Sequence, residues 1–553
     1  MRSLRAPMRH VTISRLRPHG GYMKTLVQQL ELDRIEYRRL PALLLLAMVF
    51  WFSSLSVYSI SIDQEFAALQ AGPLWWVSQG RWTTHFLTHY VLPQPVVPYL
   101  PHLILCGALA VSYLLLLRAH ELRCDNRALF VFPLFAAFPT WYFIGEFYAN
   151  LLSVSVGLLF CCTAVLIFTL MLRAYERGGM PVGTLTAAMA AAAVLLGAAL
   201  GTYQSYIAAF AAMVLGSWLL EWRAGSLKLD RGFPVIRRLV WLAVVLGCSA
   251  VFYQLVSVLM RLLLSAPSDY VGGFVNLSGF LARPLSVSAS IIKEAAHFYA
   301  GSSKLFGVTL SGCGVLVLLG LGSVLSSRGG GAKYLGGALL LALLCLLAPF
   351  GLHFMSGGGG TMPYRTMVAA PYAAWLMGML ALSACTGWQR KAAYAALFVG
   401  GFQLLNAHAS YSGARILTLG HDRELAAAVY ARIVQHAPEF DRSYRQKVDF
   451  HGAKPFSSVL PKPYSSTIGY SFFEWDGGNP VRIFYFMKLI GYDGLQLIGS
   501  EEREALQSVY AGMPVWPAAD SVRRVGDTVL VKLGDEAGHK NEAHFSLIDS
   551  IPH

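Results

Sequence analysis

The sequence predicts a mainly helical membrane protein that crosses the bilayer many times and ends in a smaller α/β domain. Of its 553 residues, 55% are hydrophobic and only 13% are charged, and the mean hydropathy is +0.51. Soluble globular domains carry about twice that share of charged residues. Apolar runs of about 20 residues, the length that a helix needs to cross a bilayer, recur along the first three quarters of the chain. The remainder is polar and marks off a second region.

The apolar runs predict about eleven transmembrane helices. The first begins after a basic N-terminal tail, and the last ends where the polar region begins. The expected spans are residues 40–60, 98–117, 128–144, 150–172, 182–201, 203–220, 239–263, 306–325, 334–354, 366–384 and 392–409.

The distribution of charge predicts the orientation of these spans. A net charge of +14 invites a nucleic-acid function, but the lysines and arginines cluster in alternate short loops, which is typical of cytoplasmic loops. We therefore expect no nucleic-acid partner. The basic segments are the N-terminal tail and residues 118–127, 173–177, 223–238, 328–333 and 390–391.

This assignment predicts three regions. Residues 1–39 form a cytoplasmic tail, residues 40–409 form the transmembrane domain, and residues 410–553 lie outside the cytoplasm because the number of spans is odd. The two long outer loops, 61–97 and 264–305, are rich in aromatic and apolar residues, which suits helices lying in the membrane interface.

The C-terminal region has the length and the patterns of a small α/β domain. Residues 424–435 read as a helix. Residues 528–533 alternate in the manner of a strand, and the turn signal Gly526-Asp527 comes just before them. The region after Cys385 contains no cysteine, so a disulfide scaffold is excluded there.

The most informative acids are Asp63 and Glu65, which follow the first span directly. A carboxylate at the outer membrane surface could deprotonate an acceptor hydroxyl beside a lipid-borne donor. The alternative for Asp63 is a helix cap before Gln64, and the alternative for Glu65 is a first-turn residue favoured by the helix dipole.

Other polar residues also fall near the expected outer ends of spans. Arg81 and Arg365 either bind a phosphate or extend towards lipid headgroups. Arg365 follows the glycine run 357–360, which is either a close backbone approach to a ligand or a floppy connector. The further candidates for the same layer are Trp82, Glu146, Tyr203, Gln204, Tyr364, Arg261 and His353.

Taken together, these motifs resemble the type II glucosyltransferases, the O-antigen-modifying, serotype-converting membrane enzymes of bacteria and phages. The resemblance is carried by Asp63, by Gly80-Arg81-Trp82, by Tyr203-Gln204 and by Pro363-Tyr364-Arg365. It extends to the tail, where Met513-Pro514-Val515-Trp516-Pro517 leads to Val529-Leu530-Val531-Lys532.

The resemblance implies a GT-C glycosyltransferase with a polyprenyl-phosphate sugar donor and a catalytic acid in the first extracytoplasmic loop. Asp63 matches that acid and would be the general base. Many relatives carry two adjacent acids, whereas Gln64 follows Asp63 here, so the role of Glu65 stays open. Arg81, Trp82, Tyr203, Gln204 and Arg365 match further family positions.

These observations predict an inverting transfer of a sugar, with glucose expected, to a surface polysaccharide or lipid-linked glycan. The site would face outwards from a bacterial inner membrane, with the donor lipid between spans and its phosphate near Arg365 or Arg81. We expect no metal and no cofactor. Two alternatives stay open: a polysaccharide polymerase or ligase that uses diphosphate-linked glycans, and a flippase or transporter for a lipid-linked sugar.

Overall fold

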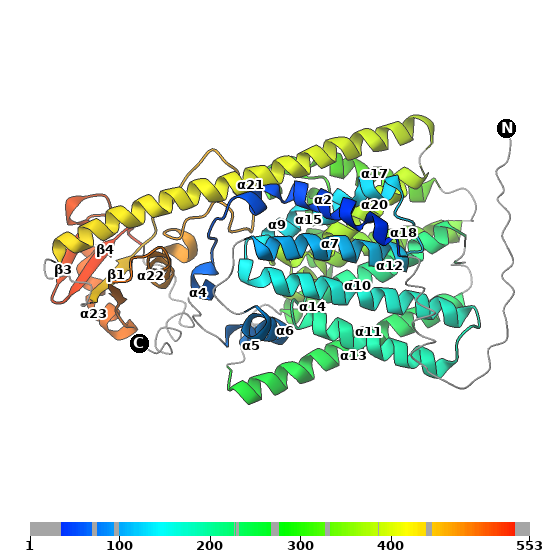
Figure 1. Ribbon diagram of the computed structural model, residues 1–553, viewed down its shortest axis with the longest axis horizontal. Coiled ribbons are helices and arrows are strands. Elements are labelled where there is room, and N and C mark those ends of the chain that lie inside the picture. The colour runs from blue at the N-terminus through cyan, green and yellow to red at the C-terminus, as the bar shows by residue number, and fades with distance from the viewer. Residues whose placement is uncertain are drawn as a thin grey trace.

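A bundle of long, roughly parallel helices makes up most of the molecule, and a small mixed α/β region sits at one end of it (Figure 1). We call this end of the bundle the domain end and the opposite end the far end. The computed structural model describes residues 35–68, 74–92, 99–225, 227, 232–266, 276–326, 332–384, 386–437 and 445–536. Most of the predicted N-terminal tail and parts of the predicted loops 61–97 and 264–305 lie outside the described residues.

The helices are numbered as in Figure 1. They are α2 (Leu40–Phe50), α3 (Phe52–Ser56), α4 (Gln64–Ala68), α5 (Trp75–Ser78), α6 (Trp82–Phe86), α7 (Leu100–Ala119), α8 (Asn126–Ala136), α9 (Pro139–Gly145), α10 (Tyr148–Glu176), α11 (Val182–Leu200), α12 (Tyr206–Arg223), α13 (Gly232–Leu264), α14 (Leu277–Ala282), α15 (Pro284–Tyr299), α16 (Ser303–Phe306), α17 (Ser311–Leu325), α18 (Ala332–Leu347), α19 (Gly351–Ser356), α20 (Ala370–Ala384), α21 (Gly387–His436), α22 (Pro480–Leu489) and α23 (Ser500–Ala511).

Within the described residues, five helices are long and apolar enough to cross a membrane, or six if the bent pair α8 and α9 is one span. This confirms a mainly helical membrane protein. Helices also lie across the other predicted spans, but α17 and α20 are shorter than the usual length for crossing. The count of eleven transmembrane helices therefore stays a prediction.

The bend between α8 and α9 has a local cause. Asp125 caps α8, where its Oδ1 accepts a hydrogen bond from the backbone N–H of Ala128 at 3.0 Å. Phe138 is extended, and Pro139 then starts α9 at an angle of 47° to α8. The bend directs the end of α9, with Glu146 just beyond it, towards the domain end.

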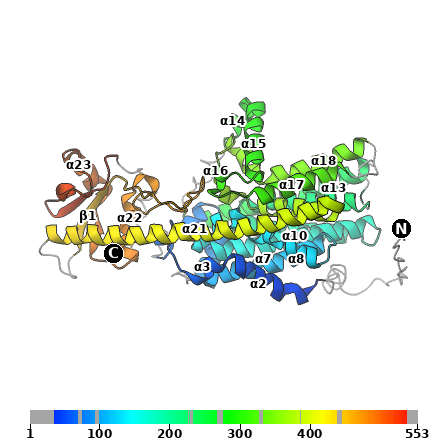
Figure 2. The same cartoon turned by 90° about the horizontal axis from the view of Figure 1, so that it is seen from above.

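Helix α21 joins the bundle to the C-terminal region. It runs without interruption for 50 residues, about 75 Å at the usual rise per residue. The predicted helix 424–435 lies within it, and so does the predicted boundary at residue 410. Figures 1 and 2 show that one half of α21 packs along the bundle and the other half carries the C-terminal sheet.

The sheet of the C-terminal region has the strand order β2-β1-β4-β3. Strands β1 (Gln446–His451) and β2 (Leu495–Leu497) are parallel, and β4 (Thr528–Lys532) pairs parallel to β1 and antiparallel to β3 (Val522–Val525). The predicted strand near residue 528 is therefore confirmed. Gly526, at a φ of +63°, and Asp527 form the two-residue turn between β3 and β4.

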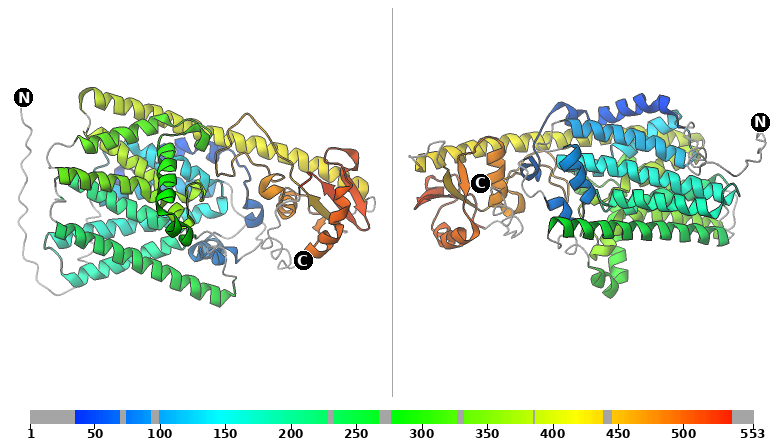
Figure 3. Two further views of the ribbon diagram at one scale, coloured as in Figure 1. Left: turned by 180° about the vertical axis from the view of Figure 1, so that it is seen from behind. Right: turned by 60° about the horizontal axis from the view of Figure 1, so that its bottom comes forward.

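Helices α14 and α15 stand across the direction of the bundle helices (Figures 2 and 3). In α15, Val287 and Ile291 are buried, whereas Leu285 and Ile292 are exposed. Leu281 of α14 is exposed as well. The sequence of loop 264–305 predicts helices that lie in the membrane interface, and this location stays a prediction.

Candidate functional site

The segment that carries Asp63 is held in the core of the C-terminal region. After α3 the chain continues without helix to α4, and Ile60 and Ile62 are buried on the way. They belong to the same hydrophobic cluster as Phe450 of β1 and Val481 of α22. The first loop therefore depends on residues nearly 400 positions later for its conformation.

Asp63 lies directly before α4 in an uncommon backbone conformation. Its φ is +73°, a region that aspartate tolerates better than most residues with a side chain. Its carbonyl accepts the first helical hydrogen bond, from the N–H of Ala67 at 3.2 Å. Its side chain is 50% exposed. Asp63 is thus the member of the acid pair that a bound molecule can reach.

Arg482, in the first turn of α22, binds both predicted acids. Its Nη2 lies 2.8 Å from Oδ1 of Asp63, and its Nη1 donates to Oε1 of Glu65 at 2.6 Å. Its Nε donates to Oδ2 of Asp476 at 2.6 Å. The guanidinium also stacks 5.0 Å above the ring of Phe66. One buried cation is therefore shared by three carboxylates.

The two acids that Arg482 binds in the first loop differ in their burial and in their electrostatic environment. Glu65 is fully buried, and its desolvation raises the pKa of this carboxyl to about 8, with the nearby charge of Asp63 adding to the effect and Arg482 opposing it. Glu65 is therefore mostly protonated at neutral pH and shielded from solvent. Sequence reasoning named both acids but missed Arg482, because nothing in its local sequence links it to the first loop.

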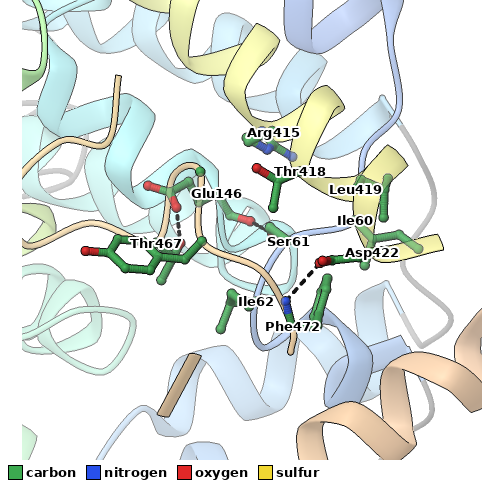
Figure 4. A pocket seen from close by; sticks show the side chains of 12 residues that line it. Ile60, Ser61, Ile62, Glu146, Arg415, Thr418, Leu419, Asp422, Thr467 and Phe472 are labelled. Atoms are coloured by element: carbon green, nitrogen blue, oxygen red, sulfur yellow. Dashed lines mark hydrogen bonds between the residues drawn. The ribbon is translucent and has the colours of Figure 1, made fainter. Parts of the chain in front are cut away.

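Glu146 joins the end of α9 to the C-terminal region (Figure 4). Its Oε1 accepts a hydrogen bond from Ser466 Oγ at 2.8 Å, and its Oε2 accepts one from Thr467 Oγ1. Its backbone carbonyl accepts one from Ser61 Oγ, two residues before Asp63. Burial raises the pKa of Glu146 to about 7, although both hydroxyl donors favour the ionised form. Glu146 is thus placed to hold three segments together.

A small cavity lies beside Glu146, and one face of α21 lines it with Arg415, Thr418 and Asp422. Figure 4 shows these side chains and Ser61 around the same space. Asp422 is fully buried and accepts hydrogen bonds from Ser471 Oγ at 2.5 Å and from the N–H of Phe472 at 2.9 Å. Burial raises its pKa to about 7.

The two motifs Gly80-Arg81-Trp82 and Tyr203-Gln204 contact each other. The Arg81 guanidinium lies 4.8 Å from the centre of the Tyr203 ring. Gln204 Nε2 donates to the carbonyl of Gln79 at 2.7 Å. Gly80 has a φ of +72°, and a Cβ there would come within 2.3 Å of the Tyr253 hydroxyl. The sequence predicted one shared layer for these motifs, and the structure places them side by side.

Trp82 and the turn that holds Tyr203 are also in contact. Trp82 starts α6 and packs edge-on against Phe252 of α13, with ring centres 6.3 Å apart. The N–H of Thr83 donates to the carbonyl of Gly201 at 3.0 Å. These contacts hold the start of α6 against the turn between α11 and α12.

Tyr364 and Arg365 precede α20 and belong to a third group. The Arg365 guanidinium lies 4.8 Å from the centre of the Phe147 ring, next to Glu146 in sequence. Tyr364 is buried against Phe298, with ring centres 5.4 Å apart. In α19, His353 Nδ1 lies 3.4 Å from Oε2 of Glu294.

The glycine run 357–360 docks on α15. The N–H of Gly360 donates to Oε2 of Glu294 at 2.6 Å, and the N–H of Gly359 donates to Ser290 Oγ at 3.1 Å. A Cβ on Gly359 would lie 2.9 Å from the Glu294 carboxylate. The backbone of the run therefore packs closely against α15, and the predicted approach of this run to a ligand stays a prediction.

The chemistry of these groups is that of acids and arginines. Among the described residues, no group of three or more His, Cys, Asp or Glu side chains is arranged to hold a metal ion. What the domain end offers is an exposed carboxylate, Asp63, and two arginines stacked on aromatic rings, Arg81 and Arg365.

Comparison with known proteins identifies the family. The family model described as "Glucosyl transferase GtrII" matches residues 52–382. This range contains every site residue predicted from the sequence and leaves out Arg482. The search of curated proteins and the search of solved structures gave no match. Because the matched range covers well over half of the chain, the protein belongs to the GtrII glucosyl transferase family.

Proposed function

We propose that this protein transfers glucose from a polyprenyl-phosphate donor to a surface polysaccharide such as O-antigen, at the outer face of a bacterial inner membrane. Membership of a glucosyl transferase family implies a sugar donor and an acceptor, and the apolar helices place the chain in a membrane. The observation that carries the proposal is Asp63, a half-exposed carboxylate at the domain end, within the matched range.

In the proposed reaction, Asp63 takes the proton of an acceptor hydroxyl as its oxygen attacks the anomeric carbon. The bond between that carbon and the phosphate oxygen breaks, and the phosphate leaves with the bonding electrons. Attack from the face opposite to the leaving group inverts the anomeric centre. Burial of Glu65 and its raised pKa support giving this role to Asp63 alone.

The leaving phosphate needs positive charge rather than an acid, because it departs as an anion. Arg81 and Arg365 are the candidates, and their guanidinium planes are oriented by aromatic rings. We propose that Trp82, Tyr203 and Gln204 hold the Arg81 turn. Glu146 and Tyr364 are proposed to fix the neighbouring segments that carry Asp63 and Arg365.

The proposed orientation follows from the charge pattern of the loops. Arg118, Arg173 and Arg177 lie at or near the far end of helices α7 and α10, as expected for the cytoplasmic side. With eleven spans, the domain end and residues 410–553 then face the periplasm. The location of Asp63 at the domain end agrees with this orientation.

The test is glucose transfer by purified protein in lipid, with undecaprenyl-phosphate glucose as the donor and unmodified polysaccharide as the acceptor. Asp63→Asn should lower kcat by about 10²–10⁴-fold, the usual contribution of a general base. Glu121→Gln, an exposed acid at the far end, is the control and should retain activity.

Three other results would overturn the proposal. Near wild-type turnover by Asp63→Asn would reject Asp63 as the base. Transfer only from a diphosphate-linked glycan would favour a polymerase or ligase. Movement of the lipid-linked sugar between leaflets without any transfer would favour a flippase.

A further inference from the structure

We infer that Arg482 is a positioning residue of the transferase site, supplied by the C-terminal region to orient Asp63. The inference rests on the proposed role of Asp63 as the base. It gives residues 445–536 a part in the reaction that neither the family match, which ends at residue 382, nor the sequence motifs assign.

The start of α22 is built to present Arg482 to the first loop. The side chain of Asn479 accepts a hydrogen bond from the N–H of Val481 at 2.9 Å, and Pro480 occupies the first helical position. These two residues fix the first turn, in which Arg482 is the third residue. The arginine side chain is only 6% exposed, so its direction is held by packing.

The contacts of Arg482 hold the Asp63 side chain from one side and leave the other side open. Its Nη2 binds Oδ1 of Asp63 at 2.8 Å, while Glu65 and Asp476 occupy its Nη1 and Nε. The planar fork of donors gives this arrangement a defined geometry that a lysine cannot reproduce. Asp63 keeps half of its side-chain surface for the acceptor.

The charge of Arg482 matters as well as its geometry. Asp63, Glu65 and Asp476 surround one guanidinium, and three carboxylates so close together repel one another when ionised. The positive charge of Arg482 offsets this repulsion and lets the three side chains gather around one point.

The chain around Asp63 is also fixed by the same region. Ile60 and Ile62 are buried in the hydrophobic cluster that contains Val481 of α22. Ser61 donates to the backbone of Glu146, whose carboxylate binds Ser466 and Thr467. The C-terminal region thus sets the position of the backbone and of the carboxylate.

The experiment compares Arg482→Gln and Arg482→Lys with Arg503→Gln. Arg503 is a matched control, because it forms a similarly buried pair, with Nε 2.7 Å from Oδ1 of Asp449, inside the same region and outside the proposed site. For each variant, kcat per folded molecule and KM for undecaprenyl-phosphate glucose are measured, together with the melting temperature.

We expect Arg482→Gln to lower kcat by about 10- to 100-fold with little change in KM, as for a misplaced reacting group. Arg482→Lys keeps the charge without the planar fork and should recover part of kcat. Arg503→Gln should lower the melting temperature and leave kcat per folded molecule unchanged.

The outcomes separate this inference from the proposed function. Wild-type kcat in Arg482→Gln, with Asp63→Asn inactive, would reject the role of Arg482 and leave Asp63 as the base. A loss of activity in Arg482→Gln that matches the loss of folded protein, with kcat per folded molecule unchanged, would show that Arg482 only stabilises the fold. If Arg482→Gln does not fold, Arg482→Lys decides, because full kcat in that variant also rejects the inference. An active Asp63→Asn rejects the proposed function itself.

Discussion

Two buried networks of arginine and carboxylate lie at opposite ends of the helical bundle, and they differ in their balance of charge. At the far end, Arg173 and Arg238 bind Glu221 at 2.6 and 2.7 Å, and Arg238 also binds Glu176 at 2.5 Å. Arg237 lies 3.4 Å from Glu176 as well, so three arginines there face two carboxylates. At the domain end, Arg482 alone faces three carboxylates.

The difference appears in the protonation of the acids. Burial opposes ionisation of Glu221, but Arg173 and Arg238 outweigh it and hold the pKa of that carboxyl below its usual range. Burial of Glu65 is not outweighed by Arg482, and its pKa rises to about 8. The far-end network, which has more arginines than carboxylates, thus fixes helix ends, whereas the domain-end network, which is short of positive charge, keeps an acid close to titration.

The largest effect on stability is expected from Glu221→Gln. The substitution leaves two buried arginines short of negative charge, and breaking such a pair costs about 3–5 kcal/mol. We expect a much lower melting temperature in detergent or nanodiscs, followed by intrinsic tryptophan fluorescence. The activity per folded molecule should persist, since Glu221 lies at the end remote from Asp63. A melting temperature within a degree of wild type would contradict the structural role of the far-end network.

The next effect is a loss of stability as the pH rises. Glu146 and Asp422 both have a pKa raised to about 7 by burial. When the pKa of a carboxyl is higher in the folded protein than in the unfolded chain, its protonation favours folding. This contribution to stability is complete below the pKa in the unfolded chain, which is near 4.5 for Glu146, and it is lost as the pH rises through the pKa in the folded protein. We therefore expect the free energy of unfolding to fall by about 2–3 kcal/mol for each group between pH 5 and pH 8. The melting temperature should fall over the same range.

The control for this pH dependence is Glu146→Gln, which imitates the protonated acid. The groups that face Glu146 are Ser466, Thr467, Arg415 and Arg365, and those that face Asp422 are Ser471, Glu474 and Lys462. The variant should show a shallower fall of melting temperature between pH 5 and pH 8. An equally steep fall in the variant would assign the pH dependence to other groups.

Glu65→Gln is expected to stabilise the protein at neutral pH. Because burial raises the pKa of Glu65, the wild-type carboxyl must take up a proton on folding above about pH 4.5, whereas a glutamine does not, and its Oε1 can still accept from Arg482. The variant should match wild type below about pH 4.5 and become more stable than wild type as the pH rises to about 8, by about 2–3 kcal/mol at pH 7. A lower melting temperature in the variant than in wild type at pH 7 would show that Glu65 is ionised in the folded protein.

The sequence predicted the parts of this fold that depend on local signals. Apolar length identified the long bundle helices, and the turn Gly526-Asp527 identified the start of β4. The sequence did not predict that the helix containing residue 409 continues into the C-terminal region. Residues 410–423 include glycine, arginine and aspartate, which end an apolar run, but loss of hydropathy marks an exit from hydrocarbon and not the end of a helix.

The residues of the candidate site could be proposed from the sequence, but only part of their arrangement could be. Asp63 and Glu146 stood out because acids at span ends are costly and rare. Their partners, Arg482 and the pair Ser466 and Thr467, lie 320 or more positions later in the chain. Contacts at such separation are set by how the C-terminal region docks, and a single sequence carries no local signal for them.

The smallest effect is expected at an ion pair that is exposed. Arg177 and Glu121 lie at the far end like the network of Glu221, with 3.2 Å between Nη2 and Oε1, but their side chains are 69% and 41% exposed. Solvent and salt screen such a pair, so Glu121→Gln should change stability by at most about 0.5 kcal/mol. The measurement is the melting temperature at low and high salt, beside that of Glu221→Gln. A loss comparable to that of Glu221→Gln would mean that pairing alone, and not the burial of the paired groups, stabilises this end of the bundle.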